Sequence, residues 1–172
     1  MDWSRHGLLG GDVLPVLWKG GWNLSWKERA IRQIFFECKR CGTCCQEPKI
    51  VDIYPRDALR IARRFRISMR LAAKRHFMRH PKDDERLTLR NVAPCEFYQN
   101  GCRIYRSRPL ICRMYPYLAG PTIYCETSTG ELPEMDDQDV IIKLAKVTNL
   151  RILEIEDYLR YIGAWKDGRF TS

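Results

Sequence analysis

The chain has 172 residues, of which 45% are hydrophobic and 30% are charged, and its formal net charge is +9. This length allows one domain with its own hydrophobic core, and the composition is neither that of a disordered chain nor that of a membrane protein. No apolar run approaches the roughly 18–20 residues that a membrane-spanning helix needs. Residues 1–22 contain Asp2 and are broken by Gly10, Gly11 and Pro15. They lack the features of a secretory signal, so we expect a cytoplasmic protein.

In chain order, the first predicted element is a short amphipathic helix, WKERAIRQIFF, which leads into a loop over residues 38–45. Pro55 suits the first position of the next helix. Its apolar residues repeat at i, i+3, i+4 and i+7, namely Ala58, Ile61, Ala62 and Phe65. Ser68 is expected to cap a further helix. One face of that helix carries Met69, Ala72, Ala73, His76 and Phe77.

The middle of the chain is predicted to contain short strands. RLTLR alternates like a strand, EFYQNGCRIY has an Asn-Gly turn between two strand-like runs, and PTIYCE is a weaker strand candidate. SRPLICRMY is expected to form a helical turn capped by Ser107, and two helices are expected between Asp136 and about Trp165, with a break near Asn149.

These elements predict an α+β, mostly helical fold, with a small irregular cysteine-rich metal-binding core, short strands and flanking helices. We expect an N-terminal extension (1–25), a cysteine-cluster domain (26–130) and a helical C-terminal tail (131–172) that packs on the core or on a protein partner.

Eight cysteines fall into two groups. The first group is dense, because FECKRCGTCCQ (36–46) places four thiols within eight positions: Cys38, Cys41, Cys44 and Cys45. The second group is spread out and consists of Cys95, Cys102, Cys112 and Cys125.

Clustered thiols form disulfides, redox-active pairs or metal sites. Disulfides are disfavoured in a reducing compartment, where such clusters more often bind metal. A thioredoxin-like C-x-x-C pair belongs between a strand and a helix of a βαβ unit. Here the motif is followed by a polar stretch, QEPKI. The sequence therefore favours a metal site.

The second group poses a geometric problem. A regular hairpin around Asn100-Gly101 would place Gln99 opposite Cys102 and Cys95 opposite Arg106. The two cysteines would then lie about 13 Å apart along the ladder, too far to bind one metal ion. Either the loop is irregular and brings them together, or they serve different sites. Cys112 follows Pro109 near a helix N-terminus, which favours a thiolate, so we expect Cys112 to complete the site, with Cys95 or Cys102 next in line.

Seven basic residues lie within a few positions of a cysteine: Lys39, Arg40, Lys49, Arg103, Arg106, Arg108 and Arg113. Nearby cations stabilise the net negative charge of a four-thiolate site, although such residues also occur as solvated surface charges. We expect Arg108 or Arg113 to hydrogen-bond inward. His76 and His80 are spaced to add ligands, but His76 falls on the apolar stripe, so a core histidine or a helix C-terminal cation is the preferred interpretation.

Three segments, FECKRCGTCC, IYPRDALRIARRF and CEFYQNGCRIYRSRPLICRMYPY, together resemble the CxxCxxCC (YkgJ-like) family of cysteine-cluster proteins, described as a zinc- or iron-chelating domain. The resemblance covers roughly residues 35–125. It includes the clustered thiols, the Asp after the proline, the C-x-x-Y-x-x-R-P-x-x-C-R string and the Tyr-Pro that follows. It implies a chelating set of Cys38, Cys41, Cys44, Cys45, Cys95, Cys102 and Cys112. Cys125 fits less securely because no CPG follows it.

The spacing also bears on the metal. Three ligands at C-x-x-C-x-x-C with a remote fourth are typical of [4Fe–4S] clusters. Zinc prefers two ligand pairs, and the second group supplies no tight pair. The spacing therefore slightly favours an Fe–S cluster, with zinc as the alternative. Two metals, with Cys44 and Cys45 pointing to different sites, are also compatible with eight cysteines.

Charge is unevenly distributed along the chain. Residues 56–82 hold ten Lys or Arg against Asp57, whereas residues 131–157 hold eight acids and three bases. The basic helices have two candidate partners, nucleic acid and the acidic tail. Nucleic acid is the less favoured partner, because no reading motif or interleaved aromatic residues accompany the charge.

Three classes of function remain. The first is a metal-binding protein, Fe–S or zinc, with a structural, redox or metal-handling role. The second is a protein-modifying, methylase-like enzyme or its accessory subunit, because flagellin lysine methylases carry a similar cysteine cluster. The third is a nucleic-acid-binding zinc protein. No Gly-rich cofactor loop, P-loop or Ser/His/Asp spacing is present, so no catalytic residue is assigned.

Overall fold

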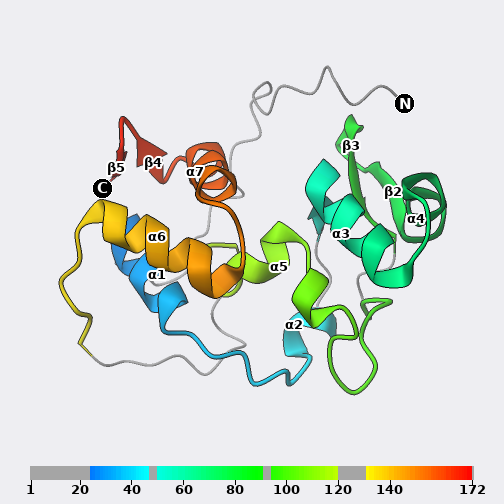
Figure 1. Ribbon diagram of the computed structural model, residues 1–172, viewed down its shortest axis with the longest axis horizontal. Coiled ribbons are helices and arrows are strands. Elements are labelled where there is room, and N and C mark those ends of the chain that lie inside the picture. The colour runs from blue at the N-terminus through cyan, green and yellow to red at the C-terminus, as the bar shows by residue number, and fades with distance from the viewer. Residues whose placement is uncertain (1–23, 47–49, 91–93, 120–130, 172) are drawn as a thin grey trace. The chain divides into compact units, whose positions relative to one another are not determined.

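The computed structural model describes residues 24–46, 50–90, 94–119 and 131–171. The fold is α+β and mostly helical, as predicted, with helices α1–α7 and short antiparallel strands (Figure 1). The chain divides into two compact units. We call residues 37–113 the cysteine unit, and residues 1–36 with 114–172 the helical unit. No helix of the described residues is long and apolar enough to cross a membrane. The strand predicted for PTIYCE and most of the N-terminal extension lie outside the described residues.

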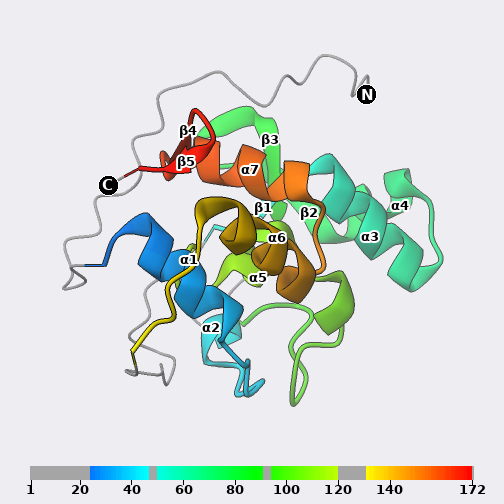
Figure 2. The ribbon, with the colours of Figure 1, turned by 60° about the vertical axis from the view of Figure 1, so that its left-hand side comes forward.

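In its described residues the helical unit has three helices and one hairpin. These are α1 (Trp26–Ile34), α6 (Asp137–Thr148), α7 (Ile152–Tyr161), β4 (Trp165–Lys166) and β5 (Arg169–Phe170). α1 begins at the predicted place because Ser25 and Glu28 form a reciprocal capping box. α1 packs against α6, and the β4–β5 hairpin follows α7 (Figure 2). The predicted break near Asn149 is confirmed, because Asn149 adopts a left-handed conformation that ends α6.

The core of the helical unit combines apolar side chains with a buried amide. The fully buried apolar residues include Ala30, Val140, Ile141, Leu144, Ile155 and Leu159. The amide of Gln33 donates to the carbonyl of Tyr115 at 3.1 Å and accepts from the backbone N–H of Tyr117 at 3.2 Å. This one side chain therefore satisfies two buried backbone groups of the segment that follows α5.

The cysteine unit is built around a three-stranded sheet in the order β1-β3-β2. Its elements are α2 (Thr43–Gln46), β1 (Asp52–Ile53), α3 (Pro55–Phe65), α4 (Met69–His76), β2 (Phe77–His80), β3 (Asp83–Leu89), η2 (Tyr105–Ser107) and α5 (Leu110–Met114). The strand predicted for RLTLR is confirmed within β3. The predicted turn at SRPLICRMY forms later than expected, because α5 begins at Leu110 and Ser107 instead belongs to η2.

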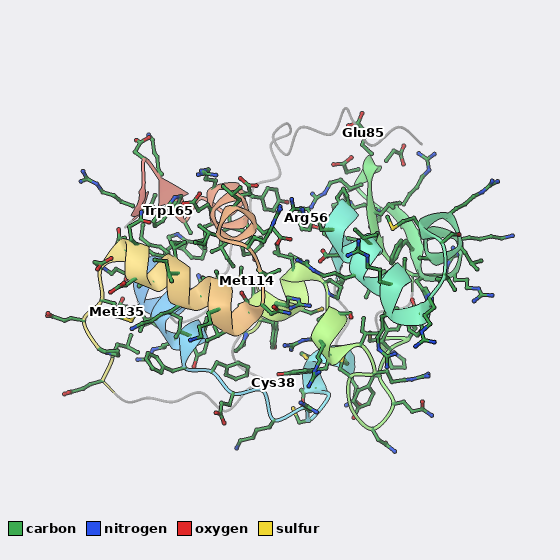
Figure 3. The ribbon with its side chains drawn as sticks, viewed as in Figure 1. Cys38, Arg56, Glu85, Met114, Met135 and Trp165 are labelled. Atoms are coloured by element: carbon green, nitrogen blue, oxygen red, sulfur yellow. The ribbon has the colours of Figure 1, made fainter. Side chains whose placement is uncertain are left out.

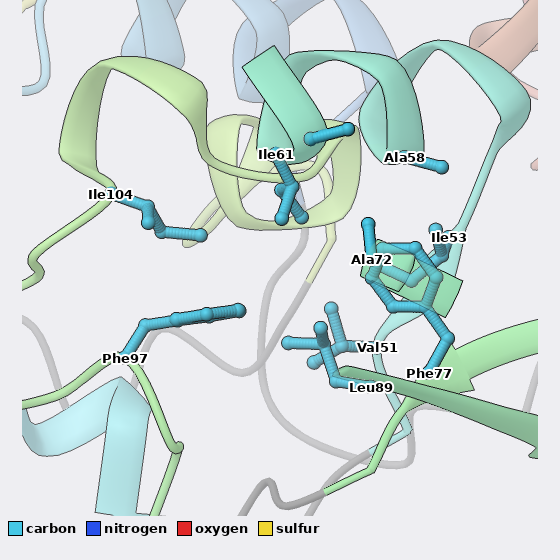
Figure 4. Packing of buried hydrophobic residues seen from close by; sticks show 10 residues of the cluster. Val51, Ile53, Ala58, Ile61, Ala72, Phe77, Leu89, Phe97 and Ile104 are labelled. Atoms are coloured by element: carbon cyan, nitrogen blue, oxygen red, sulfur yellow. The ribbon is translucent and has the colours of Figure 1, made fainter. Parts of the chain in front are cut away.

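The apolar core of the cysteine unit joins the sheet to α3 and α4. Val51, Ile53, Phe77 and Leu89 meet Ala58, Ile61 and Ala72, and Phe97 and Ile104 close the cluster (Figure 4). Pro55 opens α3, and the Ser68 hydroxyl accepts a bond from the N–H of Leu71 at 3.2 Å, so both predicted helix starts are confirmed. α4 ends at His76, so Phe77 buries its ring from β2 rather than from the predicted helix face.

A buried carboxylate ties α3 to the start of α5. Asp57 is fully buried, and its two oxygens accept the N–H groups of Leu110 (3.1 Å) and Tyr54 (3.3 Å). Burial raises the pKa of Asp57 to about 6, although the two backbone bonds and Arg60 favour its charged form. Asp57 therefore fixes the start of α5, the helix that carries Cys112.

Replacing Asp57 tests this anchor. Asp57→Ala leaves two buried N–H groups without an acceptor, so we expect the free energy of unfolding to fall by about 2–4 kcal/mol. The matched control is Asp84→Ala at an exposed position of β3, which should change stability by less than about 0.5 kcal/mol. Denaturant unfolding of both variants measures the difference. Equal stability of the two would show that Asp57 is not an anchor.

Candidate metal centre

Seven of the predicted ligands lie in the described residues, and all seven belong to the cysteine unit: Cys38, Cys41, Cys44, Cys45, Cys95, Cys102 and Cys112. None of these seven forms a disulfide. Cys125 lies outside the described residues. The described part of the chain contains no group of three or more His, Cys, Asp or Glu side chains already arranged to hold a metal ion.

The first cysteine group is held in a tight turn followed by one turn of helix. Arg40 (φ 55°) and Gly42 (φ 84°) both have left-handed backbones on either side of Cys41. The N–H of Cys45 donates to the carbonyl of Gly42 at 2.8 Å and starts the short helix α2. The predicted loop is therefore partly helical, and this compact shape gathers Cys41, Cys44 and Cys45.

Tyr98, from the second cysteine group, covers this turn. An ideal Cβ on Gly42 would lie 2.1 Å from Cε2 of the Tyr98 ring, so only glycine leaves room for the ring. The Tyr98 hydroxyl also donates to the carbonyl of Cys41 at 3.3 Å. The two cysteine groups therefore pack directly against each other.

A backbone bond brings the two groups together at their cysteines. The N–H of Cys95 donates to the carbonyl of Cys45 at 2.7 Å. The sulfurs of Cys44 and Cys45 lie 4.0 Å apart. The pKa of the Cys45 thiol is raised, first by hydrogen bonds with the thiols of Cys44 and Cys95 and then by burial.

Cys102 belongs to the same neighbourhood. Burial is the main reason that its thiol pKa is raised, and the charges of Cys95 and Cys44 raise it further. The N–H of Ile104 and the charge of Arg108 act in the opposite direction. Thiols crowded in this way resist losing their protons together, and a metal cation removes that penalty by replacing the protons. The donor set therefore fits a thiolate-bound metal.

The remaining three described thiols differ in environment. Cys41 is exposed, and the pKa of its thiol is lowered mainly by a hydrogen bond with the Thr43 side chain, whose oxygen lies 3.3 Å from the sulfur. Cys38 is half-buried where the chain enters the loop (labelled in Figure 3). Cys112 is half-buried and packs against the apolar core of the unit. Its predicted role as the ligand that completes the site stays a prediction.

The regular hairpin considered for the second group is wrong. Tyr98, not Gln99, pairs with Cys102, and this pair is an isolated bridge. The N–H of Tyr98 bonds back to the carbonyl of Cys95 at 2.9 Å, so the chain turns there instead of extending. The N–H of Cys95 bonds outside this loop, to the carbonyl of Cys45. The irregular loop is therefore the alternative that holds, and it places Cys95 and Cys102 in one neighbourhood.

Two arginines near the cysteines share one aromatic ring, and we call Arg40 and Arg108 on Tyr105 the cationic layer. The guanidinium groups of Arg40 and Arg108 lie over the Tyr105 ring, 4.3 and 3.8 Å from its centroid. Arg108 also donates to the carbonyl of Tyr105 at 3.0 Å. Arg113 is buried and donates to the carbonyls of Arg106 and Arg108, which confirms the expected inward-facing arginine.

Both histidines have carboxylate partners. Nδ1 of His76 lies 2.6 Å from Glu96, and its ring stacks on Phe65 at 5.3 Å. His80 is buried, with Nε2 3.6 Å from Asp52. These contacts agree with a structural role for His76 and His80 rather than a role as metal ligands. Tyr98 and Tyr105 also contact the neighbourhood of the cysteines, and neither was expected from the sequence, although the C-x-x-Y string places Tyr105 three residues after Cys102.

Gly42 offers a test of the packing between the two groups. In Gly42→Ala the new methyl group displaces the Tyr98 ring and forces a left-handed alanine. Gly163→Ala is the matched control, because Gly163 has a similar φ of 74° but open space around it, so it should cost only about 1–2 kcal/mol. We expect Gly42→Ala to cost at least twice as much and to lower metal content.

Adding Tyr98→Leu makes room for the methyl group, so the double variant should be less destabilised than the sum of the two single variants. Denaturant unfolding and metal analysis of the three variants measure this. Additive effects would mean that Tyr98 does not pack on Gly42.

Comparison with known proteins agrees with the geometry. The model of the CxxCxxCC family, described as "Putative zinc- or iron-chelating domain", matches residues 37–146. Neither a search of curated proteins nor a search of solved structures found a significant match. The family match spans 110 of the 172 residues (146 − 37 + 1) and includes both cysteine groups. The chain therefore belongs to the CxxCxxCC family of metal-chelating domains.

Proposed function

We propose that the protein holds a [4Fe–4S] cluster on the thiolates of its cysteine unit and serves a structural, redox or metal-handling role in the cytoplasm. The contact of Cys95 with Cys45 carries this proposal, because it joins the two cysteine groups into one site. When bound, such a cluster supplies one-electron chemistry or cross-links the fold. The residues of this chain supply the thiolates, their spacing and the compensating charge.

Two features support an Fe–S cluster. The C-x-x-C-x-x-C spacing in the first group, completed from elsewhere in the chain, is common among [4Fe–4S] ligands. Four thiolates give such a centre net negative charge, which suits the cationic layer of Arg40 and Arg108 on Tyr105. Zinc is the second candidate, because the neighbourhood of Cys44, Cys45, Cys95 and Cys102 matches the four ligands that structural zinc requires.

The contacts also rank the remote ligands. Cys95, Cys102 and Cys112 all pack against the apolar core. Cys95 and Cys102 in addition interact with the thiols of Cys45 and Cys44 in the first group. We therefore place Cys95 and Cys102 ahead of Cys112 as partners of Cys38, Cys41, Cys44 and Cys45. This ranking reverses the order that helix position alone suggested. Cys125 remains the least supported member of the proposed set.

Anaerobic purification tests the metal and the ligands together. We expect iron and acid-labile sulfide with absorbance near 400 nm, whereas zinc without colour would favour the second candidate. Cys44→Ser and Cys95→Ser should lose most of the metal and become less stable, because metal binding contributes to folding. Cys112→Ser is the comparison variant and should retain more metal than Cys95→Ser. The opposite order would restore Cys112 as the ligand that completes the site.

The cationic layer gives a second prediction. Arg108→Gln removes the charge that favours the Cys102 thiolate, and we expect metal affinity to fall by about tenfold, as for other groups that support metal ligands. Arg103→Gln removes the same charge at an exposed neighbouring position and should have a much smaller effect. Competition with a chelator at fixed pH measures both affinities. Equal losses would mean that only the net charge matters.

The alternative functions differ in the process to which the metal-binding domain contributes. A methylase-like activity predicts methyl transfer from S-adenosylmethionine to a protein substrate, and its absence with metal-loaded protein would favour a purely metal-binding role. We also propose that residues 26–130 contain the metal-binding domain, whose compact part is the cysteine unit of residues 37–113. The helices of residues 131–172, which pack with α1 in the helical unit, would offer a surface to a protein partner.

A further inference from the structure

Exposed basic residues are concentrated on α3 and α4. The two helices are joined by only three residues, 66–68, and form a helical hairpin within the cysteine unit. Seven of its basic residues are exposed, and six of these lie together in the sequence from residue 63 to residue 75: Arg63, Arg64, Arg66, Arg70, Lys74 and Arg75. Nitrogen-tipped side chains extend outward from both helices in Figure 3. We call these six residues the basic hairpin.

The charge of the basic hairpin is not balanced locally. Asp57 is the only acid between residues 55 and 82, and it is buried and bonded to the start of α5. None of the six side chains forms an ion pair with a residue that the structure describes. An ordinary surface helix alternates acids and bases, because like charges at i, i+4 such as Arg70 and Lys74 repel each other. This surface therefore costs stability without any internal benefit.

Several of the eight acids of residues 131–157 bond to partners within the helical unit. Asp137 bonds to Lys27 at 2.8 Å, and Glu156 and Asp157 both pair with Arg160. Glu154 caps the start of its own helix. These acids have partners within the helical unit. Docking on the acidic tail was the other partner that the sequence offered to the basic helices, and an acidic polypeptide is therefore one of the probes below.

The composition of the surface indicates its partner. Five of the six residues are arginines, whose planar guanidinium groups bind phosphate oxygens in pairs. A membrane-binding helix would present large apolar side chains beside its charges. Here Ile61 is buried, and Phe65, Ile67 and Met69 pack against the core. Leu59 is the one large apolar side chain of α3 and α4 that is exposed. A phosphate backbone fits this surface better than a bilayer does.

We propose that the basic hairpin binds the phosphate backbone of nucleic acid without reading its sequence. Bases are not read, because the exposed face of the hairpin offers charge but no aromatic side chain for stacking. This function is independent of which metal the cysteines hold. The sequence alone made nucleic acid the less favoured partner. The structure changes this ranking, because the exposure of the basic hairpin and its lack of ion pairs are visible only in the fold.

Fluorescence anisotropy with the full-length, metal-loaded protein tests the proposal. The probes are labelled DNA and RNA duplexes of about 20 base pairs, titrated between about 50 and 300 mM KCl. We expect the logarithm of the binding constant to fall linearly with the logarithm of salt concentration, by about 0.9 for each phosphate contacted. Two duplexes of unrelated sequence should bind equally well.

The test variant is Arg63→Gln, Arg64→Gln, Arg70→Gln and Lys74→Gln combined. It should bind at least about tenfold more weakly in low salt, and its salt slope should fall by about 3. The matched control removes four exposed charges from the helical unit, at Lys143, Lys146, Lys166 and Arg169, and should bind like the parent protein. Thermal unfolding and metal content check that both variants are folded.

Three outcomes would overturn the proposal. The first is no duplex binding at about 50 mM salt, a condition that favours electrostatic contacts. The second is an equal loss in the control variant, which would show that net charge alone drives binding. The third is equal or tighter binding to polyglutamate or to vesicles containing phosphatidylserine, which would assign the surface to an acidic protein or to a membrane.

Discussion

The packing of the CxxCxxCC turn against residues 95–102 is the constraint on which the metal centre depends. Two contacts define it: the N–H of Cys95 on the carbonyl of Cys45, and the Tyr98 ring on Gly42. Without them the two cysteine groups are separate loops that cannot share a ligand. With them the thiols of Cys44, Cys45 and Cys95 are close enough to alter one another's ionisation. The fold therefore brings thiols of both cysteine groups into one neighbourhood.

Buried polar groups hold this arrangement in a unit with a small apolar core. Asp57 accepts backbone groups at the starts of α3 and α5, and Arg113 binds the carbonyls that precede α5. Burying such charges is costly unless their hydrogen bonds are satisfied. Here each charge satisfies backbone groups that secondary structure leaves without partners. The same two side chains therefore fix the path of the chain around Cys102 and Cys112.

The arginines of the cysteine unit fall into two groups, one near the thiols and one exposed on α3 and α4. Arg40 and Arg108 lie on the Tyr105 ring, and Arg108 favours the Cys102 thiolate. These cations act on the site itself. The arginines of α3 and α4 are exposed and lack acidic neighbours, so their field extends into solvent. The same net charge of +9 therefore combines local compensation with a surface suited to an external anion.

Local signals in the sequence determined most of the secondary structure and the family. Pro55, Ser68 and Asn149 set helix boundaries through their own backbone preferences, and RLTLR formed a strand because alternation is a local property. The arrangement of the second cysteine group was decided only by tertiary structure. The N–H of Tyr98 bonds back to the carbonyl of Cys95, and Tyr98 pairs with Cys102, so the loop is not a regular hairpin. Tertiary contacts join residues some fifty positions apart, as Cys45 and Cys95 are. The periodicity or spacing of one segment cannot predict which distant segment will pack against it, hydrogen-bond to it or place a charge beside it.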